Sequence, residues 1–203
     1  MVSVPDSINS FISFIIFLNL TDPSVLSNSL VGHTDAVWGL SLHSQKPHLL
    51  SCSADGTVRL WNPQSKAPLM SVFTAAESDG IPTSVDFVRD DSSRMVTSYT
   101  SAACLLFDLE TGKVVTRLDT DQGVEDSVFG RQINRVISHP TLPLTITAHE
   151  DRHIRFYDNN TGKLAHAMVA HLDAVTCLAV DPNGLYLLSG STYTFQDQVL
   201  YFI

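Results

Sequence analysis

Residues 51–62 read S-C-S-A-D-G-T-V-R-L-W-N, and a Gly32-His33 pair stands a short way upstream. An Asp-Gly pair between two apolar runs predicts a tight hairpin turn in the middle of this stretch. His33, Ser51 and Asp55 are also the residue types of a serine-hydrolase triad. Two interpretations therefore compete: the stretch carries chemistry, or it holds a β fold together.

The stretch belongs to an internal repeat. G-H-T-D-A-V at 32–37 returns as A-H-L-D-A-V at 170–175, an offset of 138 residues, or three times 46. The aromatic residue in R-L-W-N at 59–62 returns in L-F-D at 106–108 and in R-F-Y-D at 155–158. The repeat is therefore about 46–50 residues long, and about three and a half copies are present.

Each copy has the pattern of β-strands. The first copy contains V-W-G-L-S-L, H-L-L-S-C-S, T-V-R-L-W and P-L-M-S-V-F, which are rich in β-branched or aromatic residues and are separated by polar, glycine or proline breaks. Four short strands per repeat predict a propeller blade, a twisted antiparallel sheet that packs face to face on its neighbours. We expect blades over residues 32–75, 80–119 and 130–169, and a half-blade over 170–191.

The motif G-H…S-x-S-x-D-G-T-V-R-L-W-N closely resembles the WD repeat. Longer strings resemble the C-terminal WD-repeat domain of the striatins, among them L-V-G-H-T-D-A-V-W-G-L, G-I-P-T-S-V-D-F and S-H-P-T-L-P-L-T-I-T-A-H-E-D-R-H-I-R-F. The resemblance covers residues 22–191. It implies an all-β fold, an incomplete WD-repeat β-propeller of three four-stranded blades and a half-blade.

In WD repeats a histidine, a serine or threonine, an aspartate and a tryptophan form a buried hydrogen-bonded chain. The resemblance assigns these roles in the first copy to His33, Ser51, Asp55 and Trp61. The partial sets of the third and fourth copies are Thr147, Asp151, Tyr157, His171 and Ser189. These residues are expected to stabilise the blades rather than to act on a substrate.

A small hydrolase that uses His33, Ser51 and Asp55 is the catalytic alternative. Such an enzyme exposes its serine on a strained turn, usually within G-x-S-x-G, and no G-x-S-x-G occurs in the chain. The second copy keeps little of the set beyond Phe107, and the fourth has Tyr193 in the aspartate position. A structural motif tolerates such losses and catalysis does not, so the sequence favours the structural role.

H-E-D-R-H at 149–153 matches the zinc-protease pattern H-E-x-x-H. That pattern works on a helix, where positions i and i+4 share one face and can hold one metal ion. Here strand-like segments flank the motif, so His149 and His153 are expected on either side of a hairpin turn. A zinc at His149 and His153 is therefore the weaker interpretation, and no metal or other cofactor is expected.

The composition disfavours further classes of function. Lys and Arg number 12 and Asp and Glu number 21, so the formal net charge is 12 − 21 = −9. No basic cluster is present, so nucleic acid is not an expected partner. The three cysteines, Cys52, Cys104 and Cys177, are expected as small buried side chains in a reducing compartment. Nothing in the sequence assembles a site for a small-molecule substrate.

Both ends depart from the striatin pattern. Residues 1–21 form an apolar leader that does not match the family, and residues 192–203 stand where a turn aspartate and an R-L-W-N strand are expected. The apolar run at 11–20 is shorter than the roughly 17–25 residues of a membrane-spanning helix. A truncated product without an independent function is therefore a further alternative.

The two ends also suggest a structural hypothesis. An incomplete ring leaves sheet faces and edges uncovered. We expect residues 8–20 to cover an exposed apolar face. We expect the tail to add a strand to the half-blade, because Val199, Leu200 and Tyr201 suit a strand.

The resemblance implies a non-enzymatic protein–protein interaction module. Striatins gather protein phosphatase type 2A and germinal-centre kinases into one complex, so the implied partners are proteins of these kinds. The implied location is cytoplasmic, with partial membrane association. The calmodulin-binding and caveolin-binding segments of striatins precede their propeller, and residues 1–21 do not resemble them.

Overall fold

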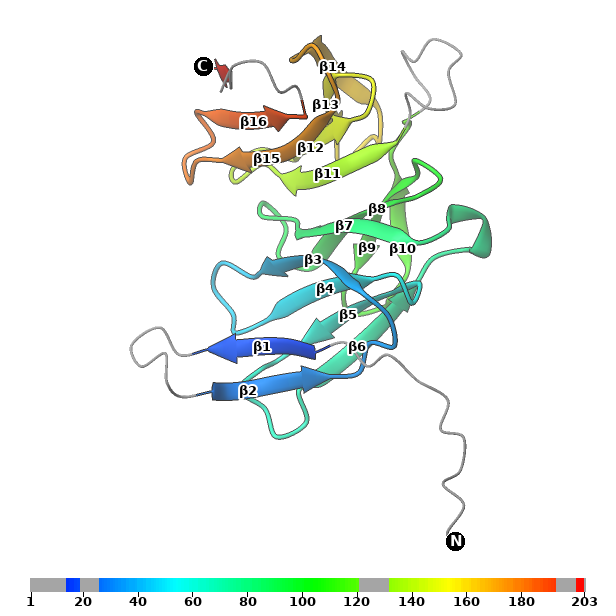
Figure 1. Cartoon of the computed structure of the whole chain (residues 1–203), viewed down its shortest axis with the longest axis vertical. Helices are drawn as coiled ribbons and strands as arrows, with labels where there is room; N and C mark the ends of the chain where they lie inside the picture. The colour runs from blue at the N-terminus through cyan, green and yellow to red at the C-terminus, as the bar shows by residue number, and fades with distance from the viewer. Residues whose placement is uncertain (1–13, 19–25, 121–131, 193–199, 203) are drawn as a thin grey trace, which may run out of the picture.

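The computed structural model describes residues 14–18, 26–120, 132–192 and 200–202. Within these ranges the regular structure is β, apart from one 3₁₀ turn at Glu77–Asp79. The sheets stand side by side in a curved row, from β1 and β2 at one end to β15 and β16 at the other (Figure 1). No helix in these ranges is long and apolar enough to cross a membrane. The predicted all-β fold is confirmed.

Three blades contain four antiparallel strands each, paired in chain order. The first blade consists of β3 (Val37–Leu42), β4 (Leu49–Ser53), β5 (Thr57–Trp61) and β6 (Leu69–Thr74). The second consists of β7 (Pro82–Phe87), β8 (Arg94–Tyr99), β9 (Cys104–Asp108) and β10 (Val114–Arg117). The third consists of β11 (Ile133–Ser138), β12 (Leu144–His149), β13 (His153–Asp158) and β14 (Leu164–Val169). The first strands of successive blades contact one another, so β3, β7, β11 and β15 line the inner side of the row.

The hydrophobic core lies between the blades. Each blade presents one face to its predecessor and one to its successor, and three buried clusters fill the gaps. These clusters include Leu50 with Met95, Leu106 with Val136, and Ile146 with Leu178. Burying one such side chain stabilises the fold by about 1.5–3 kcal/mol. Packing between blades is therefore the main source of stability.

Burial differs between the strands of one blade. The middle strands β8 and β9 are buried on both faces, which explains the nearly continuous apolar sequence of β9. The outermost strands β6, β10 and β14 are largely exposed. Burial therefore falls toward the outermost strand of each blade.

The fourth sheet has three strands rather than the two of the predicted half-blade. β15 (Val175–Val180) pairs with β16 (Leu187–Ser191), and β16 pairs antiparallel with β17 (Leu200–Phe202). The tail therefore adds a strand, as hypothesised, with Leu200 opposite Ser189; Val199 lies outside the described residues. The propeller is incomplete, as predicted. The domain limits near residues 21 and 191 stay predictions.

A two-stranded hairpin covers part of the first blade. β1 (Phe14–Leu18) pairs antiparallel with β2 (Leu26–Val31). Ile15 and Leu30 form a buried cluster with Leu49 and Trp61 of the first blade. The hairpin covers only part of this face, since Leu42 on β3 remains 67% exposed. This arrangement agrees with the hypothesis that the leader covers an apolar face, for the part of the leader that the structure describes.

Candidate functional site

Four side chains form a hydrogen-bonded chain within the first blade. Trp61 Nε1 donates to Ser51 Oγ over 2.8 Å, and Ser51 Oγ lies 2.7 Å from His33 Nε2. On the other side of the imidazole, His33 Nδ1 lies 2.8 Å from a carboxylate oxygen of Asp55. Every donor meets an acceptor if His33 is neutral and carries its proton on Nδ1, because Ser51 can then donate to Nε2. We call these four residues the first-blade brace.

The brace joins different elements of the blade. His33 precedes β3, Ser51 lies on β4, Asp55 lies in the turn after β4, and Trp61 ends β5. Gly32 gives the tryptophan its room, because a Cβ atom there would lie only 3.0 Å from the indole ring. The brace therefore fixes the loop before the first strand against the second and third strands.

The turn holds the Asp55 carboxylate in place. One oxygen accepts from Thr57 N over 2.9 Å and from Thr57 Oγ1 over 2.6 Å. The other accepts from Thr34 N over 3.1 Å and lies 3.6 Å from Arg59 Nη2. These hydrogen bonds fix the orientation of the Asp55 carboxylate, so that one of its oxygens faces the His33 imidazole.

The pKa values of the brace follow from burial and hydrogen bonding. Burial lowers the pKa of His33 below 6.5, and the hydrogen bond and charge of Asp55 oppose this only in part. Burial acts to raise the pKa of Asp55, but hydrogen bonds from Thr57, His33 and Thr34 outweigh it and lower the value to about 2. At neutral pH a neutral imidazole therefore faces a carboxylate.

The brace has no accessible nucleophile. Ser51 and Trp61 are 0% exposed and His33 is 1% exposed. The Ser51 hydroxyl already donates to the imidazole and accepts from the indole, and it lies in the middle of a strand rather than on a strained turn. This geometry gives no route by which a substrate could reach the hydroxyl, so the hydrolase alternative has no structural support.

The third blade arranges its residues differently from the assigned set. Thr147 Oγ1 lies 2.7 Å from His149 Nε2, and both side chains are fully buried. Asp151 pairs with Arg155, and one of its carboxylate oxygens lies 3.3 Å from Nδ1 of His153 in the same hairpin. Tyr157 is buried, and its hydroxyl has no hydrogen-bond partner among the described residues. The assigned Thr147, Asp151 and Tyr157 therefore do not form one chain.

The two histidines of H-E-D-R-H belong to a hairpin. His149 ends β12 and contacts Thr147, whereas His153 begins β13 and its Nδ1 lies 2.8 Å from the carbonyl oxygen of Asp151. In the described ranges no three His, Cys, Asp or Glu side chains are grouped to hold a metal ion. The strand-turn-strand setting predicted for the motif is present.

Comparison with known proteins shows what the chain is similar to. The chain is 59% identical to Striatin-3 of Homo sapiens over 172 residues, 61% identical to Striatin of Mus musculus over 170 residues, and 54% identical to Striatin-4 of Homo sapiens over 171 residues. Each match covers 84% of the chain. The profile "WD domain, G-beta repeat" matches residues 24–62 and 162–199. The chain matches the WD-repeat region of the striatin family.

These matches cover most of this chain but only a small part of each striatin. The chain spans 21–22% of the length of these striatins. Among solved structures, it is similar to the crystal structure of the computationally designed Ika4 protein, with a TM-score of 0.64 and 20% identity, over 85% of this chain and 94% of that one. At this identity the likeness supports the fold alone.

The other blades of this striatin-type propeller keep fragments of the brace. His171 Nε2 lies 2.8 Å from Ser189 Oγ in the fourth blade, whereas Tyr193 lies outside the described residues. In the second blade the buried Asp79 stands 46 residues after His33, in the histidine position, and pairs with Arg117. Asp79 does not match the WD-repeat motif at this position, so only its 46-residue offset from His33 marks it in the sequence.

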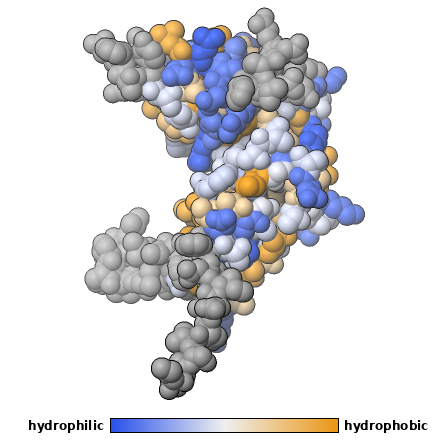
Figure 2. Space-filling model, turned by 45° about the vertical axis from the view of Figure 1, so that its right-hand side comes forward, coloured by the Kyte–Doolittle hydropathy of each residue, from blue (hydrophilic) through white to orange (hydrophobic). Residues whose placement is uncertain are grey.

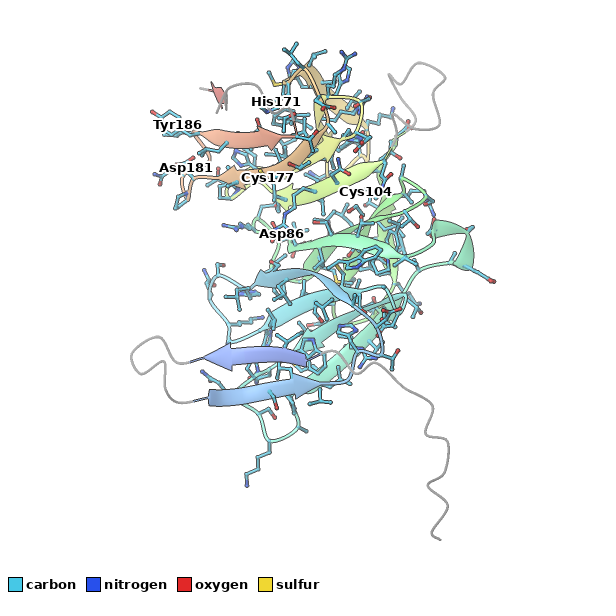
Figure 3. All side chains as sticks on the ribbon, in the orientation of Figure 1. Asp86, Cys104, His171, Cys177, Asp181 and Tyr186 are labelled. Atoms are coloured by element: carbon cyan, nitrogen blue, oxygen red, sulfur yellow. The ribbon has the colours of Figure 1, made fainter. Side chains whose placement is uncertain are left out.

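Asp86 is a second residue that the sequence did not single out. It lies on β7 between β3 and β11 (Figure 3), where Ser41 Oγ donates to Oδ1 over 2.6 Å and Ser138 N donates to Oδ2 over 2.8 Å. Burial raises its pKa, and these hydrogen bonds oppose the rise in part. Asp86 thus ties the first strands of three striatin-type blades together.

The cysteines are not equivalent. Cys52 and Cys104 are fully buried, and burial raises the pKa of both thiols, that of Cys52 to about 12. Neither is poised as a thiolate nucleophile. Cys177 on β15 is exposed, so the expectation of burial was wrong for it (Figure 3). Its strand belongs to the fourth sheet of the described row, where the face turned away from the third blade is uncovered.

Proposed function

We propose that the chain is a non-enzymatic protein–protein interaction module of the striatin type. The observation that carries the proposal is the 54–61% identity to three striatins over 84% of the chain. The burial of His33, Ser51 and Asp55 supports it further, because the only triad-like set noted in the sequence serves the fold. Both observations favour binding over catalysis.

The turns between first and second strands offer a surface for a protein partner. Leu142 in the third blade and Leu185 and Tyr186 in the fourth are 49%, 63% and 47% exposed, and we call them the turn patch. Their turns lie against each other, since His139 Nε2 is 3.2 Å from the carbonyl oxygen of Gly184. Tyr186 projects at the end of the β15–β16 hairpin (Figure 3).

The turn patch is held rigid by local hydrogen bonds. His139 Nδ1 accepts from Leu142 N over 3.0 Å, and the Asp181 carboxylate accepts from Tyr186 N over 2.7 Å. A preorganised apolar patch with an aromatic side chain loses little conformational entropy on binding. It therefore suits a protein surface of complementary shape.

The family resemblance suggests the partners. We infer protein phosphatase type 2A and germinal-centre kinases as the complex members to test. Because the chain spans 21–22% of the striatins it matches, it would hold only contacts made by the propeller surface, or compete for them. On the same ground we propose a cytoplasmic location with partial membrane association.

Affinity capture tests this function. The tagged full chain is incubated with cell extract, and bound proteins are identified by mass spectrometry against a tag-only control. We expect phosphatase subunits and kinases of the named classes, with retention reduced by Leu185→Ser. Leu172→Ser is the matched control, because Leu172 is 76% exposed but precedes β15 at the other end of the strand.

Two outcomes would contradict the proposal. One is capture of neither class of protein by the unmodified chain. The other is covalent labelling of Ser51 by a fluorophosphonate probe in the folded protein, since that would show an activated and accessible serine.

A further inference from the structure

A hollow of about 320 Å³ lies on the inner side of the row, where β3, β7, β11 and β15 come together. Figure 2 shows the molecule as concave on this side, at the left of the view. The apolar lining of the hollow includes Leu42, Ile137, Leu178 and Val180. Its charged lining consists of Arg89, Arg135 and Asp86. The hollow thus combines an aliphatic wall with two cations.

The two arginines of the hollow are unlike most others of the chain. Arg94, Arg117 and Arg155 form ion pairs with aspartates, and Arg59 lies 3.6 Å from Asp55. Within the described ranges, neither the Arg89 nor the Arg135 guanidinium forms an ion pair. In a chain with a net charge of −9, two unpaired guanidinium groups in one concavity are a distinctive feature.

Asp86 does not neutralise these arginines by direct contact. Its two oxygens accept from Ser41 and Ser138, and the arginines act on it only through their charge. No carboxylate oxygen of the described residues forms an ion pair with Arg89 or Arg135. The N–H donors of each guanidinium are therefore available to bind the oxyanion of a ligand.

We propose that the hollow binds a peptide segment in which a carboxylate side chain stands beside an aliphatic one. Arg89 and Arg135 take the carboxylate, and Leu42, Leu178 and Val180 take the aliphatic side chain. The proposal rests on the proposed function as an interaction module and names the chemistry that this face selects.

A carboxylate fits better than a phosphate group. Arg89, Arg135 and Asp86 together give the hollow a formal charge of +2 − 1 = +1, which a monoanionic carboxylate neutralises. A dianion leaves an excess negative charge in a chain whose net charge is already −9. The aliphatic part of the lining, of which Leu42 is the most exposed, adds affinity only for a ligand that also brings an apolar group. Together these features select a mixed acidic and aliphatic peptide.

Fluorescence anisotropy of the full chain tests the proposal. The probe is a fluorescein-labelled peptide with a Glu-Leu-Leu unit flanked by Gly and Ser. We expect saturable binding, weakened about tenfold or more by Arg135→Gln or Arg89→Gln, as for loss of a charge-assisted hydrogen bond. Arg152→Gln is the matched control, because Arg152 is exposed in the β12–β13 turn, away from the hollow. Circular dichroism of each variant verifies the fold.

The design separates this proposal from the interaction function itself. Equal binding by the wild type and both hollow variants overturns it, as does tighter binding of a phosphoserine analogue of the probe. Absence of peptide binding also overturns it, while the capture of partner proteins through the turn patch still decides the proposed function. Weaker binding of the Gln-Leu-Leu analogue and weakening by salt support it.

Discussion

At the scale of single residues, His33 is the centre of the first blade. Its two ring nitrogens contact Ser51 and Asp55, and its ring meets Trp61 edge to face with centroids 6.0 Å apart. Because the ring is 1% exposed, water cannot replace a lost partner. Removal of any member therefore leaves a buried polar atom unpaired, which costs about 1–3 kcal/mol.

Ser51→Ala should lower the free energy of unfolding by about 1–3 kcal/mol, because it removes the acceptor of Trp61 Nε1 and the donor to His33 Nε2. Urea denaturation followed by tryptophan fluorescence measures the change. Ser92→Ala is the control, since Ser92 is exposed and the change there should stay within about 0.5 kcal/mol. Equal stability of the two variants would show that the brace does not support the blade.

The pH dependence of stability follows from the same residues. Burial lowers the pKa of His33, His43 and His171, so between these lowered values and 6.5 the unfolded chain binds more protons than the folded one. Stability should be complete above pH 6.5 and decline as the pH falls below it. The pKa of Asp55, about 2, adds a second loss as the pH falls from about 4 toward 2.

Thermal unfolding at pH 8, 6.5 and 5 measures the histidine effect. We expect the melting temperature to fall from pH 6.5 to pH 5, with a smaller fall in His33→Gln. A melting temperature that rises over this interval would contradict the assigned protonation of His33.

The sequence predicts some of these residues and not others. His33, Ser51, Asp55 and Trp61 stand at motif positions, so the brace could be predicted directly. His149 could not, because the repeat places its histidine before the first strand, whereas His149 ends the second strand of its blade and contacts Thr147 there. Contacts between neighbouring blades cannot be predicted from motif positions, because they depend on how the blades pack.

At the scale of elements, the hairpin of β1 and β2 shows how the first blade is covered. Its buried side chains reach Leu49 and Trp61 but leave Leu42 exposed. The strands of the blades could be predicted from alternation and turn residues. The pairing of β1 with β2 could not, because residues 1–21 follow no repeat that would set the register.

Leu30→Ala should destabilise the protein by about 2–5 kcal/mol, because Leu30 is 1% exposed and its removal leaves a cavity over Trp61. Leu42→Ala makes the same exchange at a site that is 67% exposed and should cost less than about 0.5 kcal/mol. Chemical denaturation of both variants provides the comparison. Similar values for the two would mean that the hairpin does not pack on the blade in solution.

At the scale of the whole molecule, successive blades bury each other's faces and leave turns and an inner hollow for partners. Asp86 connects β7 to β3 and β11 across 45 and 52 residues of sequence, so the blades form one unit rather than independent sheets. The number of blades could be predicted from the repeat. The turn patch and the hollow could not, since both arise where neighbouring blades meet.

We propose that this row of blades binds proteins through its surface. Biolayer interferometry of the immobilised full chain with purified protein phosphatase type 2A measures that binding. We predict saturable binding that Leu185→Ser weakens about tenfold or more and that Leu172→Ser leaves unchanged. No binding, or equal binding by both variants, would contradict the proposed interaction function.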